Sequence, residues 1–584
     1  MLSQYPLTPL PAQPLAAPAA GIQEQYQQRC AQLFAFTDTT TMSNYFIAAA
    51  KLHRRTDIAG GVKIISELLE HPAASSSGMF VSNELMAAYL YGRDVLPEEI
   101  RQRIWEKFRT RPLYRGDTEN HWVMYYTGLY LAAQTWPNFG GDHWYTGKSS
   151  QANFQEAQEW LNLWIKTTTT IGQGEFDSPT YHIVFLAPML VLQEFAHDPA
   201  MKKQAEKMVH YLLADFAAEH LQGMYCGAHS RDYPYDAIAP KNAPMTAWAW
   251  LMFGQTGAVM RPEILAAALS SYRLPEIIYQ IATDRSQPYV HTETKRVRNL
   301  IRFNDERNPP VYKYTYMTKD FALGSMQGGA ILQPIQQHLW DVTFVSDKPH
   351  CSLFTVHPYV SAHELGSFFP EEMKFTVDEV ARFHTYYGKE GKWVSSSPYA
   401  QTFQHRNAII VLYDIPPGTQ FEHIDGFFPK DLEQRVVSLE GKDLAGRWIF
   451  CQGGSTYIAY LPLKPYQWIE ESECWRLRSP ALRNGCIVEV SAAEAYPSFE
   501  AFQQQITGNA VEIYDSEETW SVGYTTSDGD QMEFTFGEER SLNGEPVDFG
   551  SYKLFNGPFL HGEVGSGRLE LRYHEMSLVL DFND

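Results

Sequence analysis

The sequence predicts a chain of two parts, a helical N-terminal region followed by antiparallel β-sheets. Apolar residues recur at steps of three and four up to about residue 285, and at every second position after about residue 290. The length of 584 residues exceeds the size at which one hydrophobic core stops growing, so at least two domains are expected. We predict a poorly ordered Pro/Ala-rich arm at 1–22, a helical domain at 23–288 and an antiparallel β-sandwich domain at 289–584.

The helical period is carried by segments that are joined by short polar or Pro/Gly-rich connections. Helix start signals include Pro97 before two glutamates, and Asp198 before Pro199. About ten such helices in series favour antiparallel hairpins arranged as a bundle, a solenoid or a toroid. The main segments are GGVKIISELLEH (60–71), SNELMAAYLYGR (82–93), LPEEIRQRIWEKFR (96–109), FQEAQEWLNLWIKT (154–167), YHIVFLAPMLVLQEFAHD (181–198), MKKQAEKMVHYLLADFAAEHL (201–221) and PEILAAALSSY (262–272).

The second half contains short β-branched and aromatic runs separated by Gly, Pro, Asp and Asn turns. One helix-like interruption, SFEAFQQQI (498–506), breaks the series. Many short strands in succession predict stacked antiparallel sheets. The clearest runs are PPVYKYTYMT (309–318), HLWDVTFVS (338–346), CSLFTVH (351–357), GKWVSSS (391–397), NAIIVLYDI (407–415), STYIAYLPL (455–463), CIVEVSA (486–492), QMEFTFGEE (531–539) and GRLELRYHEMSLVLDF (567–582).

The composition excludes several classes of function. A formal net charge of −21 argues against a nucleic-acid partner, because phosphates are bound by clustered Lys and Arg. The longest apolar run, 183–192, contains a proline and is far shorter than the roughly 20 residues of a membrane-spanning helix, so no membrane partner is expected. The N-terminus lacks the features of a secretory signal. The cytoplasm is therefore the default location, and a secreted or periplasmic one follows if a leader was removed.

Three stretches gather polar and aromatic residues beyond what packing requires: ENHW (119–122), GEFDSPTYH (174–182) and YCGAHSRDYPYD (225–236). All three fall at predicted helix ends or in loops, where sites are usually built. Each also has a purely structural interpretation. Asn120 can cap the following helix, Tyr181 can be a core aromatic, and Arg231 can pair with a neighbouring aspartate.

Taken together, these residue types suit one reaction. Cleaving a glycosidic bond next to a uronic acid by β-elimination requires removal of the proton α to a carboxylate. That step needs a group that neutralises the carboxylate, a Tyr or His base, and an acid at the leaving oxygen. Asn, His and Tyr with a nearby Arg provide such a set.

The pair Asn120–His121, followed 61 residues after Asn120 by Tyr181 on a helical region that precedes a β region, resembles the alginate lyases and heparinase II/III-like polysaccharide lyases. Chondroitin AC and hyaluronate lyases share this plan and a related Asn, His, Tyr and Arg set. The resemblance implies an incomplete (α/α) toroid of helix hairpins whose cleft is closed by the β domain. It also implies β-elimination on an acidic, uronic-acid-containing polysaccharide or oligosaccharide.

Carried onto this sequence, the resemblance implies that Asn120 and His121 neutralise the substrate carboxylate, or that His121 acts as base. Tyr181 serves as base, acid or both, and His229 and Arg231 complete the catalytic set. A histidine from the β domain is expected, and His338 and His405 remain open alternatives. The further expected substrate contacts are Trp122, His182, Tyr233, Tyr235 and Arg406. No cofactor is implied, and the HGHAD-like pattern that accompanies a metal in heparinase relatives is not found, so a structural divalent metal is not signalled.

Two other functions stay open at this point. A glycoside hydrolase on a similar toroid would use Glu175 or Asp177 with Asp232 or Asp236 as its pair of carboxyl groups. A non-catalytic carbohydrate-binding protein would keep the fold without turnover. The overall acidity does not suit long-range attraction of a polyanion, so local positive groups are needed. The candidates for these groups are Arg231, Lys241, Lys295, Arg296, Arg298 and Arg302.

Overall fold

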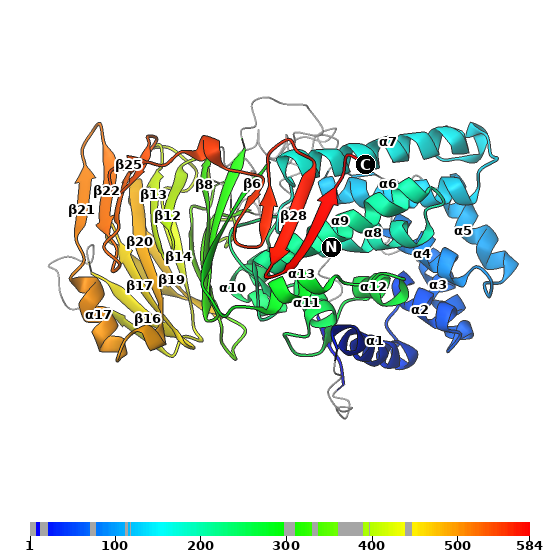
Figure 1. Ribbon diagram of the computed structural model, residues 1–584, viewed down its shortest axis with the longest axis horizontal. Coiled ribbons are helices and arrows are strands. Elements are labelled where there is room, and N and C mark those ends of the chain that lie inside the picture. The colour runs from blue at the N-terminus through cyan, green and yellow to red at the C-terminus, as the bar shows by residue number, and fades with distance from the viewer. Residues whose placement is uncertain are drawn as a thin grey trace.

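The computed structural model divides into a helical region and a β region that lie side by side along the long axis of the molecule (Figure 1). It describes residues 7–11, 21–70, 78–110, 115–116, 118–296, 310–329, 337–359, 389–395, 397–437 and 447–584. The predicted order, helices first and antiparallel sheets second, is confirmed.

The helical region is an (α/α) toroid. Helices α2, α4, α6 and α8 contact one another in that order, and α12 contacts both α8 and α2, which closes the inner row. Helices α3, α5, α7, α9 and α13 pack outside this row. The bounds are α1 Ile22–Thr39, α2 Tyr45–Arg54, α3 Ile58–Glu70, α4 Met79–Gly92, α5 Glu98–Thr110, α6 Glu119–Thr135, α7 Ser150–Ile171, α8 Ile183–Phe195, α9 Pro199–Ala218, α10 Pro234–Ile238, α11 Met245–Phe253, α12 Leu265–Leu269 and α13 Glu276–Thr283.

Most residues of the inner helices are buried, as expected of helices surrounded by others. In α8 every residue from Ile183 to Leu192 is buried. The helix ends follow from local chemistry. The side chain of Asn44 accepts a hydrogen bond from the Phe46 N–H at the start of α2, and Asp198 caps α9, with Pro199 in the first turn. None of the helices in the described ranges is long and apolar enough to cross a membrane.

The β region is built from a 12-stranded and a 6-stranded antiparallel sheet, followed by a 5-stranded one. The 12-stranded sheet has the order β18-β19-β14-β11-β10-β8-β7-β6-β26-β27-β28-β29, and the 6-stranded sheet the order β12-β13-β20-β17-β16-β15. Buried side chains of both sheets, among them Trp340, Val411 and Ile458, form one shared hydrophobic core. The bounds of the strands in the 12-stranded sheet are β6 Tyr289–Lys295, β7 Val311–Met317, β8 Phe321–Gly329, β10 Trp340–Phe344, β11 Ser352–Val356, β14 Ile424–Pro429, β18 Gln467–Glu470, β19 Cys474–Ser479, β26 Phe555–Asn556, β27 Leu560–Gly562, β28 Arg568–Tyr573 and β29 Met576–Asp581.

The helix expected at 498–506 is α17 Phe499–Thr507, with Ser498 as its cap. It shares a hydrophobic cluster with the 6-stranded and the 5-stranded sheets. The remaining strands of the two sheets are β12 Ala400–His405, β13 Ala408–Asp414, β15 Gln434–Val437, β16 Ile449–Gly453, β17 Thr456–Pro462, β20 Arg483–Ala492, β21 Val511–Asp515, β22 Trp520–Thr525, β23 Gln531–Thr535, β24 Arg540–Leu542 and β25 Glu545–Pro546.

Three pairs of two-residue strands, one of which joins the two regions, are found among the described residues and were not expected from the sequence. The pair β2 His220–Leu221 and β3 Met224–Tyr225 forms a small hairpin, and β4 His229–Ser230 pairs with β9 Gln337–His338 from the β region. Near the N-terminus, β1 Thr8–Pro9 pairs with β5 Val259–Met260. Strands of two residues are too short to show an alternating pattern, so only tertiary pairing defines them.

The last strands return to the helical region. Strand β28 contacts α7 and α13, and β27 and β29 contact α9 (Figure 1). The 12-stranded sheet therefore extends across the side of the toroid, and it fixes the two regions to each other.

Candidate active site

The site begins at the first turn of α6. Thr118 is the N-cap of this helix, and its hydroxyl accepts a hydrogen bond from the His121 N–H at 3.3 Å. The alternative role of Asn120 as the cap is therefore wrong, because the helix begins at Glu119, two residues earlier than that role requires. Asn120 is fully buried, and its amide nitrogen donates to the Thr118 hydroxyl at 2.8 Å and to Glu175 Oε2 at 2.5 Å.

This arrangement sets the orientation of the Asn120 amide. Both N–H bonds are directed at oxygen atoms of Thr118 and Glu175, so the amide oxygen points elsewhere. Among the described residues, this buried Oδ1 atom has no hydrogen-bond partner. The opposite orientation would place the amide oxygen against the Glu175 carboxylate, which is electrostatically unfavourable. Asn120 therefore presents an acceptor to the site.

Glu119 ties the loop at 174–175 to the same helix end. Its carboxylate accepts from the backbone N–H groups of Gly174 at 3.0 Å and Glu175 at 2.6 Å. It also accepts from the Trp164 indole at 2.8 Å and forms an ion pair with Arg296. Burial raises the pKa of Glu119 against the opposing effect of Arg296.

Tyr181 follows on the same segment and lies among aromatic and cationic groups. Its hydroxyl is 2.7 Å from the hydroxyl of Tyr233, and its backbone N–H donates to the Ser178 hydroxyl at 2.8 Å. The Arg231 guanidinium lies 4.3 Å from the centre of the Tyr181 ring. A cation at this position stabilises a negative charge developing on the phenol oxygen. Tyr235, 43% exposed, stacks on half-buried Tyr233 and links this group to the surface.

Arg231 also contacts Glu175, the carboxylate that accepts a hydrogen bond from the Asn120 amide. Its Nε atom is 3.1 Å from Glu175 Oε1, and both side chains are buried. Arg231 has a φ of +59° and Asp177 a φ of +50°, a left-handed backbone that side-chain-bearing residues seldom adopt. Such conformations cluster at functional sites, where the surrounding structure holds them.

A histidine from the β region completes the cluster. Strand β9 places His338 opposite His229 of β4, with ring centres 6.0 Å apart. His338 Nδ1 is 3.0 Å from Asp232 Oδ2. Burial lowers the pKa of His338, but the hydrogen bond to Asp232 and the charge of Asp341 outweigh it and raise the pKa above its usual value.

The pKa of His229 is shifted in the opposite direction. Burial, with the nearby charges of His338 and Lys313, holds its pKa well below the usual value. The pKa values of the two facing imidazoles are therefore displaced in opposite directions, which favours a protonated His338 beside a neutral His229. In the described ranges, His338 Nε2 and His229 Nδ1 are buried and have no hydrogen-bond partner. Together with Asn120 Oδ1 they give the cluster three unsatisfied polar atoms, the feature expected of a site that awaits a ligand.

A buried charge cluster lies behind the 174–178 segment. Lys295 Nζ is 3.0 Å from Asp177 and 2.7 Å from Asp215, and it also pairs with Glu293. Lys313 pairs with Asp177 and is 2.7 Å from Glu219. Burial lowers the pKa of Lys295, but the three carboxylates outweigh it and hold the pKa well above its usual range.

The three carboxylates around Lys295 have the spacing of a metal site, because their oxygen atoms lie within 4.8 Å of one another. The Lys295 ammonium already forms ion pairs with all three. This donor set therefore does not fit an additional divalent cation.

The basic residues expected to attract substrate have other roles. Lys295 and Arg296 are buried against acidic side chains, and Lys241 binds the Ser346 carbonyl. Arg298 and Arg302 lie outside the described residues.

Other predicted site residues lie beside the cluster. His121 is turned toward Gly116 and packs edge-on against Phe80, with ring centres 5.1 Å apart. Trp122 donates its indole N–H to the Gly116 carbonyl and packs against Trp160. His182 is fully buried and bonds the Leu212 carbonyl, and burial lowers its pKa to about 4.

His405 and Arg406 lie at the turn between β12 and β13. His405 is 3.1 Å from Asp530, and the Arg406 N–H donates to the Tyr314 hydroxyl. Within the described part of the chain, neither has a recorded contact with Tyr181, Arg231 or His338. The structure thus forms two adjoining groups of contacts, which the segment 229–233 connects along the chain. The first contains Asn120, Glu175, Arg231, Tyr181 and Tyr233. The second contains His229, His338 and Asp232.

Sequence reasoning missed the roles of Thr118 and Glu119. Thr118 carried a usable signal, because threonine is a preferred N-cap residue and stands directly before the helix. Glu119 carried none, since its partners at 174, 175 and 296 are remote in sequence.

Comparison with known proteins gives distant likenesses. A profile of a domain of unknown function (DUF8769) matches residues 76–273, which include Asn120, Tyr181 and Arg231. No curated protein sequence matches the chain. Among solved structures, a chondroitin AC lyase of Streptomyces coelicolor A3 in complex with chondroitin sulphate is 10% identical, with a TM-score of 0.42 over 97% of this chain and 90% of that chain.

Two further solved structures are similarly distant. Heparan sulfate lyase HepC of Pedobacter heparinus is 9% identical, with a TM-score of 0.33 over 89% of this chain and 84% of that chain. A Paenibacillus xanthan lyase is 7% identical, with a TM-score of 0.41 over 96% of this chain and 60% of that chain. All are polysaccharide lyases, the class that the sequence resembles. Because the identities and TM-scores are low, the function proposed below rests on the geometry of the site.

Proposed function

We propose that the protein is a polysaccharide lyase that cleaves a uronic-acid-containing polysaccharide by β-elimination. The single observation that carries this proposal is the segment 229–232, which places Arg231 over the Tyr181 ring, His229 opposite His338, and Asp232 against His338 Nδ1. The two facing histidines contribute buried ring nitrogens without hydrogen-bond partners among the described residues. This set can supply a proton-transferring phenol, a positive charge and a neutral imidazole to one substrate.

The environments of the groups support distinct roles. Protonated His338, held by Asp232, would bind and neutralise the substrate carboxylate and so lower the pKa of the adjacent carbon acid. Tyr181 would remove the C5 proton, with its phenolate stabilised by Arg231, and would return a proton to the leaving oxygen through the Tyr233 hydroxyl. Asn120, which presents an oxygen, would accept a hydrogen bond from a substrate hydroxyl rather than neutralise the carboxylate.

A glycoside hydrolase is less well supported. Each of its four candidate carboxyl groups already has a protein partner: Arg231 for Glu175, two lysines for Asp177, His338 for Asp232 and Thr180 for Asp236. Lys295 and Lys313 outweigh burial and hold the pKa of Asp177 well below its usual value, so this group cannot serve as a general acid.

The test is a panel of uronic-acid polymers that includes alginate, glucuronan, hyaluronan, heparan sulfate and a plant uronan. We expect at least one polymer to give the ultraviolet absorbance of the C4–C5 double bond conjugated with the carboxylate. New reducing ends without this absorbance would indicate a hydrolase. Binding without any new chain ends would indicate a non-catalytic protein.

Substituting Asp232 by Asn should shift the pH dependence of cleavage. If His338 must be protonated, activity is present below its pKa and is lost as the pH rises through it. Asp232 raises that pKa, so Asp232→Asn should move the alkaline limb of kcat/KM to lower pH. The measurement is a kcat/KM profile against pH, with the exposed Asp142→Asn as control. An unmoved alkaline limb would rule out this role for His338.

A further inference from the structure

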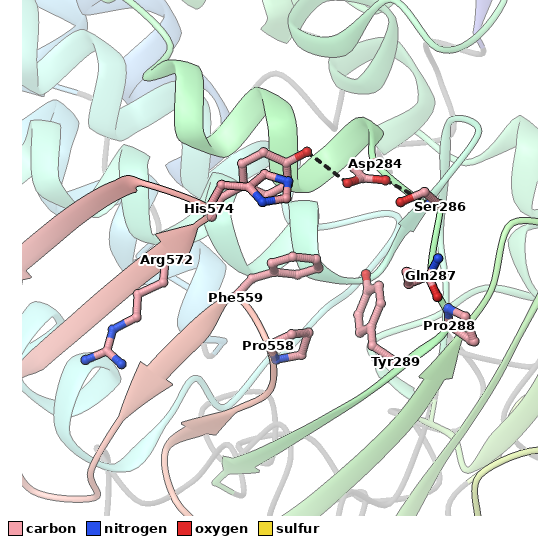
Figure 2. A pocket seen from close by; sticks show the side chains of 10 residues that line it. Asp284, Ser286, Gln287, Pro288, Tyr289, Pro558, Phe559, Arg572 and His574 are labelled. Carbon is pink, nitrogen blue, oxygen red and sulfur yellow. Dashed lines mark hydrogen bonds between the residues drawn. The ribbon is translucent and has the colours of Figure 1, made fainter.

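A second concave feature lies at the seam between the helical region and the C-terminal strands. The chain leaving α13 meets the β26–β27 and β28–β29 turns around a pocket of about 450 Å³. Figure 2 shows Phe559 and Tyr289 between Arg572 and His574 on one side and Gln287 with Pro288 on the other. We name this feature the seam pocket. Its volume falls within the range of small-ligand sites.

The aromatic side of the seam pocket is held in place. Phe559 meets Tyr289 edge-on, with ring centres 5.0 Å apart, and lies 6.0 Å from Tyr573. The Tyr289 hydroxyl donates to the Ala218 carbonyl at 2.6 Å, and the Tyr573 hydroxyl donates to Asp284 at 2.8 Å. Because these contacts fix the rings before any ligand binds, a ligand that stacks on them loses little additional entropy.

The rim of the pocket is polar and partly cationic. Arg572 binds Glu570 through Nε and Nη2, which leaves its Nη1 without a recorded hydrogen bond to a described residue. His574 occupies the first position of the two-residue turn between β28 and β29, with a φ of +48°. Gly and Asn are the usual residues there, so the turn itself does not require an imidazole. Both side chains are exposed.

We propose that the seam pocket binds a saccharide of one or two sugar units whose acidic group faces Arg572 and His574. The apolar face of a sugar ring would stack on Phe559 or Tyr573, and its carboxylate or sulfate would accept a charge-assisted hydrogen bond from Nη1 of Arg572, which Glu570 does not bind. The identity of the saccharide rests on the proposed function, since the same polymer would occupy the pocket and the Tyr181 site. The pocket would then hold the polymer on the enzyme between cleavage events.

The test uses the full chain carrying Tyr181→Phe, so that bound oligosaccharide is not consumed. Calorimetric titration with uronic-acid hexasaccharides is expected to give two binding events per chain. Adding Arg572→Gln and His574→Asn should remove one event or weaken it at least about fivefold, because a charge-assisted contact is lost. Asn is chosen at 574 because it tolerates the left-handed backbone. Exposed Arg93→Gln with His143→Asn is the matched control and should leave both events unchanged.

One binding event in all variants, or two events that the seam variant does not change, would overturn the seam pocket proposal. Thermal unfolding shows whether each variant is folded, and Phe559→Leu provides a second probe of the aromatic side. The two proposals can fail separately. If no polymer is cleaved but the seam variant still loses one event, the proposed function is wrong and the saccharide site stands. If a polymer is cleaved and the events are unaffected, the site alone is wrong.

Discussion

Replacing Tyr181 by Phe is expected to lower kcat/KM on the cleaved polymer by about 10²–10⁴-fold, the usual contribution of a proton-transferring group. The substitution removes the hydroxyl that lies 2.7 Å from Tyr233 and leaves the ring under Arg231. The aromatic packing is kept, so the free energy of unfolding should change little. KM should change much less than kcat if the hydroxyl acts in the chemical step. The rates are measured by the appearance of unsaturated products.

Tyr272→Phe is the matched control. It removes a buried hydroxyl that has no hydrogen-bond partner among the described residues and that lies on the loop between α12 and α13. We expect its rate to equal that of the wild type. Equal rates for Tyr181→Phe and the wild type would show that Tyr181 does not transfer the proton.

Replacing Lys295 by Met is expected to lower the free energy of unfolding by about 3–5 kcal/mol, because removing one partner of a buried ion-pair cluster leaves uncompensated charges. Asp177, Asp215 and Glu293 would lose the cation that they share. The same change at Lys63, which is 74% exposed, should alter stability by no more than about 0.5 kcal/mol. Denaturant unfolding of the two variants gives the comparison.

A second substitution separates lost pairing from lost packing. Glu293→Gln in the Lys295→Met background removes one of the charges left behind, so it should recover part of the lost stability. Glu293 is chosen because Lys295 and Lys313 outweigh burial and lower its pKa. In the wild-type background the same change should destabilise the protein. A Lys295→Met variant as stable as the wild type would show that the cluster does not hold the two regions together.

The architecture was predictable to the extent that it depends on local periodicity. The three- and four-residue steps of segments such as 181–198 and the alternation within 309–318 indicate helix and strand without any tertiary information. The return of β28 and β29 onto the toroid was not predictable, because an alternating strand shows that one face is covered but not by what. Strands β2 and β4 were missed because two residues carry no period.

The candidate site was predictable in part, from the local composition of three segments. Asn120, Tyr181 and Arg231 stand in segments whose composition exceeds packing needs, and the structure brings them together. The choice between His338 and His405 could not be made, because pairing of β9 with β4 joins strands that are remote in sequence. Lys295 and Arg296 were candidates for attracting the substrate, because a sequence does not reveal that acidic partners surround them.

The mass of the products tests β-elimination most directly. A uronic-acid oligosaccharide of defined length is incubated with the enzyme, and both fragments are weighed by mass spectrometry. Elimination adds no water, so the two fragment masses should add up to the mass of the substrate, and the fragment with the new non-reducing end should absorb in the ultraviolet. Fragments whose masses add up to the substrate plus one water would contradict a lyase and assign the site to hydrolysis.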